Sequence, residues 1–297
     1  MDISGIITPI LTPMNNDESV NESELRRQIN RQIDAGVNGI FPFGTNGEGY
    51  ILNSKEKEQI LSVVVNETKG RVPVYAGTGC TSTSETIHLS LMAQKLGADI
   101  LSIITPSFAV ASQEELYFHY KAVAEAVNIP IVLYNIPART GNHLSPDTVE
   151  KLSSIENIVG AKDSSGNFDN LLQYIERTRD REDFAVLSGN DSLILWTLMA
   201  GGKGGIAGCA NVYPQNMVSI CKNFQEGNLP EARLAQDAIR SLRNCFAYGN
   251  PNTIIKKAVE LLGFSVGECR KPFNIVSENG IESLKKVLAE NERKGLC

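Results

Sequence analysis

The sequence lacks the residue patterns of metal-bound and disulfide-stabilised proteins. None of its six cysteines forms a C-x-x-C pair, and its three histidines never fall in an H-x-H or H-E-x-x-H spacing. We therefore expect no zinc site, no disulfide framework and no metal-dependent hydrolase. The cysteines are expected to be reduced thiols of a cytoplasmic protein. They are Cys80, Cys209, Cys221, Cys245, Cys269 and Cys297.

Long apolar runs and an excess of basic residues are absent as well. No uninterrupted apolar run approaches about 18 residues, so no transmembrane helix is expected. The first thirty residues do not resemble a signal peptide, because Met1-Asp2-Ile3-Ser4 has no basic residue and Pro9 interrupts the apolar stretch that follows. With 28 Lys and Arg against 34 Asp and Glu, the formal net charge is −6. We expect neither a nucleic acid nor a membrane as a partner.

What is present is the composition of a large globular domain. Of the 297 residues, 42% are hydrophobic and 21% are charged, which excludes intrinsic disorder. A chain of this length buries roughly 75% of the surface that its unfolded state exposes. It therefore needs neither a metal nor a disulfide for stability.

Short apolar runs alternate with longer segments of helical periodicity. Most of the runs are rich in Val and Ile with little polar alternation, as in parallel strands covered on both faces. Ser112 with Glu115 forms a capping box, and Ser145-Pro146 places an N-cap before a proline. Eight strand candidates, most followed by a helix, predict a single (β/α)₈ TIM barrel, and the alternative is a doubly wound open sheet. The runs are residues 5–10, 37–43, 72–76, 100–104, 129–134, 158–161, 184–187 and 204–207.

After Ala207 only helical spacing is found, over residues 217–224, 232–246, 254–262 and 281–288. The first of these segments can close the last barrel unit. We predict a barrel over residues 1–226 and a C-terminal helical extension of the same domain over residues 227–297.

Three predicted strand ends carry polar residues, and in a barrel such residues gather at the mouth where function lies. The loop Gly44-Thr45-Asn46-Gly47-Glu48-Gly49 follows the second strand. Its glycines allow close approach and positive φ, so its N–H groups can bind an anion. The loop lacks both the G-x-x-x-x-G-K-[ST] and the G-x-G-x-x-G pattern, so no nucleotide is expected. An ordinary tight turn is an equally good interpretation.

The other two strand ends carry a phenol and an amine. Tyr134 ends the fifth strand and can relay protons, and Arg139 after it can bind a carboxylate bidentately. Lys162 ends the sixth strand, where an amine can act as a nucleophile that forms a Schiff base. A packed tyrosine, a surface arginine and a lysine paired with Asp163 are the alternatives for these residues taken singly. Because strands five and six are neighbours, Tyr134 and Lys162 should lie side by side, with Thr45 facing them, which favours carbonyl chemistry.

These motifs resemble the dihydrodipicolinate synthase/N-acetylneuraminate lyase family of pyruvate-dependent class I aldolases. The resemblance is collinear from about Ser4 to Pro272. The loop at residues 44–48 is similar to the family's G-[ST]-x-G-E, Tyr134-Asn135-Ile136-Pro137 to its Y-N-x-P, and Gly160-Ala161-Lys162-Asp163 to the segment of its Schiff-base lysine.

The resemblance implies a barrel with a helical C-terminal extension, assembled as a homotetramer. It implies that Lys162 attacks the ketone of pyruvate and that Tyr134 transfers protons. It assigns the pyruvate carboxylate to the loop of Thr45, Asn46 and Gly47. The resemblance also places residues 188–191 and Ile206 where the family's later strands line the pocket. The covalent lysine–pyruvate imine takes the place of a cofactor, and no metal is implied.

Within the family, three positions bear on the second substrate. Arg139 resembles the synthase, where this arginine binds the carboxylate of aspartate semialdehyde. Asn46 stands where the synthase usually has threonine, and relatives that cleave 4-hydroxy-2-oxoglutarate or 2-keto-3-deoxy sugar acids also have asparagine there. Phe108, which we expect to contact substrate, stands where the synthase has a tyrosine that completes a proton relay from a neighbouring subunit. A phenyl ring cannot pass a proton.

The sequence therefore predicts a lyase that joins pyruvate to an aldehyde or releases it from a 2-keto acid. A dihydrodipicolinate synthase-like activity on aspartate semialdehyde is favoured by Arg139. Aldolases for 4-hydroxy-2-oxoglutarate, 2-keto-3-deoxy sugar acids or N-acetylneuraminate are the alternative, and a non-catalytic keto-acid-binding barrel is a third interpretation. A nicotinamide oxidoreductase would need a glycine fingerprint that is absent. His119 and His143 are expected to be structural or surface groups.

Overall fold

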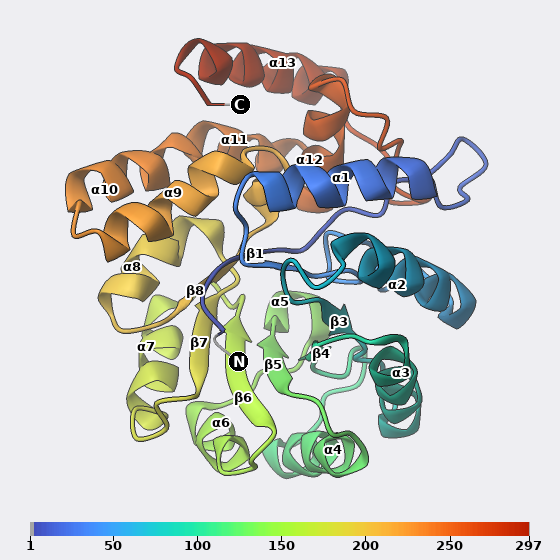
Figure 1. The fold of residues 1–297 in the computed structure, drawn as a ribbon, viewed down its shortest axis with the longest axis vertical. Helices are drawn as coiled ribbons and strands as arrows, with labels where there is room; N and C mark the ends of the chain where they lie inside the picture. Colours follow the sequence, from blue (N-terminus) through green and yellow to red (C-terminus); the bar gives the residue numbers. More distant parts are fainter. Residues whose placement is uncertain (1–2, 297) are drawn as a thin grey trace. The chain divides into compact units, whose positions relative to one another are not determined.

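The computed structural model describes residues 3–296. Eight short parallel strands, β1 to β8, alternate with helices along the chain, and further helices follow β8 (Figure 1). Two compact units make up the chain. Among the described residues, unit 1 comprises 3–5 and 73–206, and unit 2 comprises 6–72 and 207–296.

Unit 1 contains six strands that pair in the order β8-β7-β6-β5-β4-β3, so that each strand lies beside its neighbour in sequence. A doubly wound sheet would reverse its strand order at a switch point, which is not seen here. The eightfold βα succession is that of a (β/α)₈ TIM barrel, and the predicted fold class is confirmed. The strands are β3 (Tyr75–Gly77), β4 (Ile100–Ile104), β5 (Ile131–Asn135), β6 (Ile158–Asp163), β7 (Ala185–Ser188) and β8 (Gly204–Ile206).

Helices separate the strands of unit 1, and in Figure 1 several lie outside β4 to β7. The predicted capping box at Ser112 and Glu115 begins α4, and Ser145 caps α6 ahead of Pro146. Both N-caps satisfy backbone N–H groups that have no partner within the helix. The helices are α3 (Thr83–Leu96), α4 (Gln113–Ala126), α5 (Pro137–Thr140), α6 (Pro146–Ser153), α7 (Phe168–Arg177) and α8 (Ile194–Met199).

Unit 2 joins the first two βα repeats to the helices that follow β8. Strand β1 (Gly5–Thr8) pairs in parallel with β2 (Gly39–Ile40). Helices α1 and α2 pack together, as do α9 with α10 and α12 with α13. The helices are α1 (Glu22–Asp34), α2 (Ser54–Thr68), α9 (Pro214–Gln225), α10 (Leu229–Ala238), α11 (Arg240–Asn244), α12 (Pro251–Leu261) and α13 (Glu278–Arg293).

One helix prediction was wrong. Residues 232–246 do not form a single helix, since they are divided among α10, α11 and a 3₁₀ turn at Cys245–Tyr248. The backbone departs from α-helical geometry at Ile239, where ψ is −9°. Ile239 at the break and Leu242 beyond it are both buried, so the apolar period continues through the break. The predicted boundary between residues 226 and 227 lies between α9 and α10 and stays a prediction.

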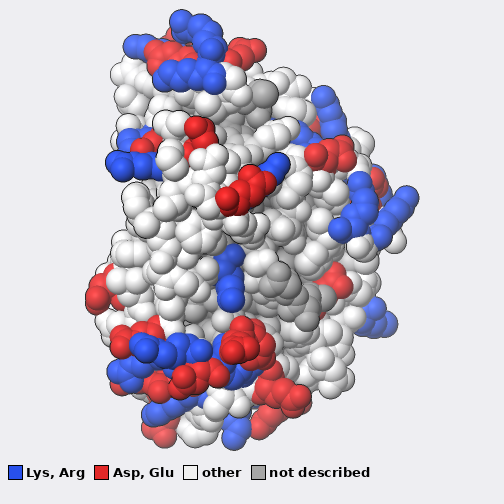
Figure 2. All heavy atoms as spheres, turned by 60° about the vertical axis from the view of Figure 1, so that its left-hand side comes forward, with Lys and Arg blue, Asp and Glu red and all other residues white. Residues whose placement is uncertain are grey.

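The described residues add three facts about sites and surface. Cys80, Cys209, Cys221, Cys245 and Cys269 are thiols that take part in no disulfide among residues 3–296. Between residues 3 and 296 no three His, Cys, Asp or Glu side chains group as metal ligands, and no helix there has the length and apolarity to cross a membrane. On the face shown in Figure 2, Lys and Arg are interspersed with Asp and Glu.

His119 makes the stability of the fold depend on pH. Its ring on α4 is 6% exposed, and Nδ1 lies 2.9 Å from the hydroxyl of Thr83 on α3. Burial lowers the pKa of His119 to about 4. An unfolded histidine has a pKa near 6.5, so between these values the unfolded chain binds a proton that the folded chain does not. Acidification through this window should cost roughly 3 kcal/mol of unfolding free energy.

Urea unfolding at about pH 7 and about pH 4.5 checks this prediction on the native chain and on His119→Phe. We expect the variant to lose less unfolding free energy than the native chain over the same interval. Equal losses would mean that His119 is protonated in the folded state.

Candidate active site

Tyr134 and Lys162 lie on neighbouring strands at matching positions. Tyr134 of β5 pairs in register with Lys162 of β6, and the Lys162 Nζ lies 3.8 Å from the centroid of the Tyr134 ring. The two side chains are only 3% and 4% exposed. A cation this close to an aromatic face is attracted by the ring. The predicted juxtaposition of phenol and amine is therefore present in unit 1.

The next pair along the same strands fixes their ends. Asn135 lies opposite Asp163, and its Nδ2 donates to Asp163 Oδ1 at 2.7 Å. Asp163 Oδ2 accepts from the Ser165 hydroxyl at 2.6 Å, and Asn135 Oδ1 accepts from the Leu144 N–H at 3.0 Å. Two neutral residues, Asn135 and Ser165, thus donate to the two oxygens of the Asp163 carboxylate. Sequence analysis placed Asp163 only as a partner of the lysine and missed its bond to Asn135.

Gly189 lies just beyond β7, and its lack of a side chain leaves space for the side chain of Lys162. A Cβ at this position would lie 2.7 Å from Lys162 Cε and would overlap the hydroxyl of Ser164. The Ser164 Oγ is buried and has no hydrogen-bond partner among residues 3–296. Because buried hydroxyls are normally hydrogen-bonded, the Ser164 hydroxyl is available to a molecule that binds beside the Lys162 amine. Nothing in the spacing of the sequence indicated Ser164.

Arg139 and Phe108 both lie at the surface of unit 1. Arg139 is exposed on the short helix α5, and Phe108 is 98% exposed with φ of 81°. Asn142 holds the loop around Phe108, because its Nδ2 donates to the carbonyls of Pro106 and Ala109 at 2.9 and 2.7 Å. The backbone that presents Phe108 outward is therefore well fixed. Ile206, by contrast, is fully buried at the end of β8.

The predicted anion loop lies in unit 2, where its glycines serve close packing. A Cβ on Gly47 would come within 2.7 Å of the Ile10 carbonyl oxygen, and one on Gly49 would overlap that of Phe43. The expected positive φ falls instead on Phe43 and Glu48, at 65° and 58°. The prediction of positive φ at these glycines was wrong, since crowding by neighbouring carbonyls, not handedness, excludes side chains at Gly47 and Gly49. The predicted approach of an anion stays a prediction.

Thr45 and Asn46, in the same loop, are half-buried. The Asn46 amide lies against Gly208, where a Cβ would be 3.2 Å from the Asn46 Oδ1. The carbonyl of Thr45 accepts a hydrogen bond from Asn252 of α12 at 2.7 Å. Asn252 was not among the residues singled out from the sequence, because it lies 207 positions away.

A buried primary amine against a phenol can do one kind of chemistry well. The amine can add to a ketone or an aldehyde, and the phenol can deliver and remove the protons that imine formation requires. The unbonded Ser164 hydroxyl adds a donor on the same side of the sheet end. The arrangement in unit 1 therefore supports Schiff-base catalysis.

Comparison with known proteins gives similarity over nearly the whole chain. A model of the dihydrodipicolinate synthetase family matches residues 2–291. A 4-hydroxy-tetrahydrodipicolinate synthase of Methanospirillum hungatei is 40% identical over 257 residues, which is 86% of this chain and 88% of the relative.

Two solved structures that hold pyruvate have closely similar folds. The chloride-inhibited dihydrodipicolinate synthase of Acinetobacter baumannii, complexed with pyruvate, has a TM-score of 0.94 and 34% identity, covering 98% of this chain and 99% of that one. YagE from E. coli K12, a prophage protein of the same family in complex with pyruvate, has a TM-score of 0.94 and 32% identity, covering 99% of both chains.

Proposed function

The chain belongs to the dihydrodipicolinate synthetase family, and from this we propose that it is a 4-hydroxy-tetrahydrodipicolinate synthase. It is a lyase of the Schiff-base aldolase class, and in the proposed reaction it condenses pyruvate with aspartate semialdehyde. The observation that carries the proposal is the pairing of Tyr134 with Lys162 at the ends of β5 and β6. Two family members with similar folds are in complex with pyruvate.

In the proposed reaction the Lys162 amine adds to the ketone carbon of pyruvate. Loss of water from the adduct gives an iminium, whose carbon–nitrogen bond accepts electrons from the neighbouring methyl carbon when that carbon loses a proton. The resulting enamine attacks the aldehyde carbon and forms the new carbon–carbon bond, and the aldehyde oxygen takes up a proton. This step regenerates the iminium, and attack on its carbon by the amine of the condensed semialdehyde or by water then releases the Lys162 amine. No metal or separate cofactor takes part, because the iminium itself is the electron sink.

Tyr134 transfers the protons of these steps. Its phenol is buried beside the amine, so it can protonate the departing hydroxyl of the adduct. We assign the pyruvate carboxylate to Thr45, Asn46 and Gly47 on the family resemblance. Backbone N–H groups in a glycine-containing turn are suited to bind such an anion.

Arg139 is the residue proposed to select the acceptor, since a guanidinium binds a carboxylate bidentately. We expect Arg139→Ala to raise KM for aspartate semialdehyde by about 10²-fold while leaving KM for pyruvate within about threefold. Steady-state kinetics with each substrate varied in turn measure both values. Arg139→Lys keeps the positive charge but cannot bind a carboxylate bidentately, so its KM for aspartate semialdehyde should lie between those of the native chain and of Arg139→Ala. A change in KM for pyruvate alone would contradict this role.

A panel of aldehydes tests the choice of substrate. Aspartate semialdehyde should give the highest kcat/KM among acceptors offered with pyruvate. Asn46 and Phe108 favour the second candidate, an aldolase for 4-hydroxy-2-oxoglutarate or 2-keto-3-deoxy sugar acids. Release of pyruvate from these 2-keto acids, with no turnover of aspartate semialdehyde, would establish that candidate in place of the synthase.

We also propose that the chain assembles as a homotetramer in the cytoplasm. Phe108 and Val110 are 98% and 83% exposed on a loop whose backbone is held in place by Asn142. A rigid exposed apolar loop is suited to contact another subunit. Free cysteines agree with a reducing compartment. Sedimentation velocity would give the assembly state, and a monomer at micromolar concentration would contradict the proposal.

A further inference from the structure

Glu48, the last residue of the G-[ST]-x-G-E motif, has no part in the reaction proposed above. Its side chain is fully buried, and its backbone has φ of 58°. A left-handed conformation of this kind is unfavourable for a residue with a Cβ and persists where the surroundings fix it. A buried carboxylate in a strained position therefore calls for a specific cause.

Both carboxylate oxygens of Glu48 are bound by residues of the C-terminal segment. Oε1 accepts from Lys256 Nζ at 2.7 Å, and Oε2 accepts from the Arg270 N–H at 2.8 Å. The Lys256 side chain is 1% exposed. A fully buried ion pair is often no more stabilising than well-packed apolar residues of the same volume. Stability alone thus gives little reason for this pair.

Helix α12 holds the loop at a second point, one helical turn before Lys256. Asn252 Nδ2 donates to the Thr45 carbonyl at 2.7 Å, so residues i and i+4 of one helix face bind the loop on both sides of Asn46 and Gly47. Thr12 donates to the Gly47 carbonyl at 2.7 Å.

The contact at Thr45 fixes the orientation of a peptide plane. In a planar trans peptide the carbonyl and the following N–H point in opposite directions. The hydrogen bond from Asn252 to the Thr45 carbonyl therefore directs the Asn46 N–H away from α12. This N–H is one of the donors that the proposed function assigns to an anion.

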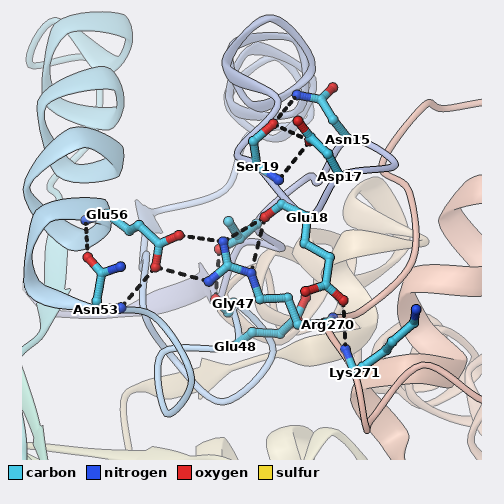
Figure 3. A network of polar contacts seen from close by, with 11 residues as sticks. Asn15, Asp17, Glu18, Ser19, Gly47, Glu48, Asn53, Glu56, Arg270 and Lys271 are labelled. Atoms are coloured by element: carbon cyan, nitrogen blue, oxygen red, sulfur yellow. Dashed lines mark hydrogen bonds and ion pairs between the residues drawn. The ribbon is translucent and has the colours of Figure 1, made fainter.

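Arg270 extends the contact to the rest of unit 2. Figure 3 shows its guanidinium between the Glu56 carboxylate and the carbonyl of Glu18. The Arg270 Nη1 donates to Glu56 Oε2 at 2.9 Å, and its hydrogen bond lowers the pKa of Glu56. The segment that supplies an N–H to Glu48 is thus anchored to the N-terminus of α2.

We propose that Asn252 and the Glu48–Lys256 ion pair form a clamp that holds the Thr45-Asn46-Gly47 loop in the conformation that binds the carboxylate of pyruvate. The inference rests on the proposed function for the identity of the anion. It makes Glu48, Asn252 and Lys256 positioning residues. Helix α12 of the C-terminal extension would then serve the pyruvate site.

Lys256→Met tests the clamp, with Lys257→Met as the matched control. Lys257 is the next residue of α12, and its 2.7 Å bond to Glu260 is local to the helix. We expect Lys256→Met to raise KM for pyruvate by at least about tenfold, with kcat and KM for the acceptor within about threefold. The control should leave all three unchanged. An unchanged KM for pyruvate in Lys256→Met would overturn the proposal.

Two further variants separate positioning from stability. Glu48→Gln/Lys256→Met removes both buried charges, so its Tm should recover toward that of the native chain while KM for pyruvate stays raised. Asn252→Ala touches no charge and should raise KM for pyruvate as well. If KM for pyruvate returned to its native value in the folded double variant, the pair would be a structural feature only, and the clamp would be wrong.

Hydrogen exchange without substrate tests the clamp independently of the reaction. The N–H groups of Glu48, Gly49 and Ile51 bond to carbonyls of the same loop. Their exchange should become faster in Lys256→Met and in Asn252→Ala, and should stay unchanged in Lys257→Met. If the native chain formed no adduct with pyruvate, the proposed function would fail, whereas unchanged exchange in the clamp variants would overturn the clamp itself.

Discussion

Lys162→Ala is expected to abolish both the covalent capture of pyruvate and its turnover. Borohydride added with pyruvate should reduce the imine and leave a stable adduct, which peptide mass spectrometry would assign to Lys162 in the native chain. The variant should give no adduct at this position, and kcat/KM should fall by a factor of at least about 10⁴, as when a covalent nucleophile is removed.

The physical reason is that the Lys162 amine is the nucleophile that lies against the Tyr134 phenol. Lys162 Nζ lies 3.8 Å from the Tyr134 ring, and its side chain is buried in the room that Gly189 leaves. Lys151→Ala is the matched control, because Lys151 is exposed on α6. This variant should keep the pyruvate adduct and the kcat/KM of the native chain. An adduct that persisted in folded Lys162→Ala, or none in the native chain, would remove the Schiff-base mechanism.

Tyr134→Phe should have the second-largest effect. The substitution keeps the buried ring against the Lys162 amine and removes only the phenol hydroxyl. Since positioned acid–base catalysis contributes typically 10² to 10⁴ in rate, we expect kcat to fall by about 10³-fold. The rate of imine trapping should fall with it, because proton transfer is needed to expel water from the adduct.

Tyr120→Phe is the control for Tyr134→Phe. Tyr120 is also fully buried, and its hydroxyl donates to the Ile103 carbonyl at 3.0 Å. Tyr120→Phe removes this hydroxyl and leaves the buried Ile103 carbonyl without that donor, so Tm should fall. Its kcat should change by less than about threefold. Stopped-flow trapping and thermal unfolding of both variants compare the two roles. Native-like trapping rates in Tyr134→Phe would mean that another group transfers the proton.

The sequence by itself determined the fold class and the central pair of the site. Apolar runs of four to seven residues, most of them rich in Val and Ile and most followed by a helical period, indicate a parallel βα succession. In the barrel that this succession predicts, consecutive strands are neighbours, so residues at the ends of β5 and β6 are expected to meet. Tyr134 and Lys162 could be brought together for this reason alone, before any coordinates.

Only the tertiary structure decided how the loop after β2 is held. Glu48 and Lys256 are 208 residues apart, and no local pattern links a glutamate in a turn to a lysine on a distant helix. The use of Gly47 and Gly49 for close approach depends on the Ile10 and Phe43 carbonyls that lie against them. The break at Ile239 was hidden as well, because the apolar period continues through it. Periodicity reports which face of an element is buried, whereas the partners of buried polar groups are set by packing between distant segments.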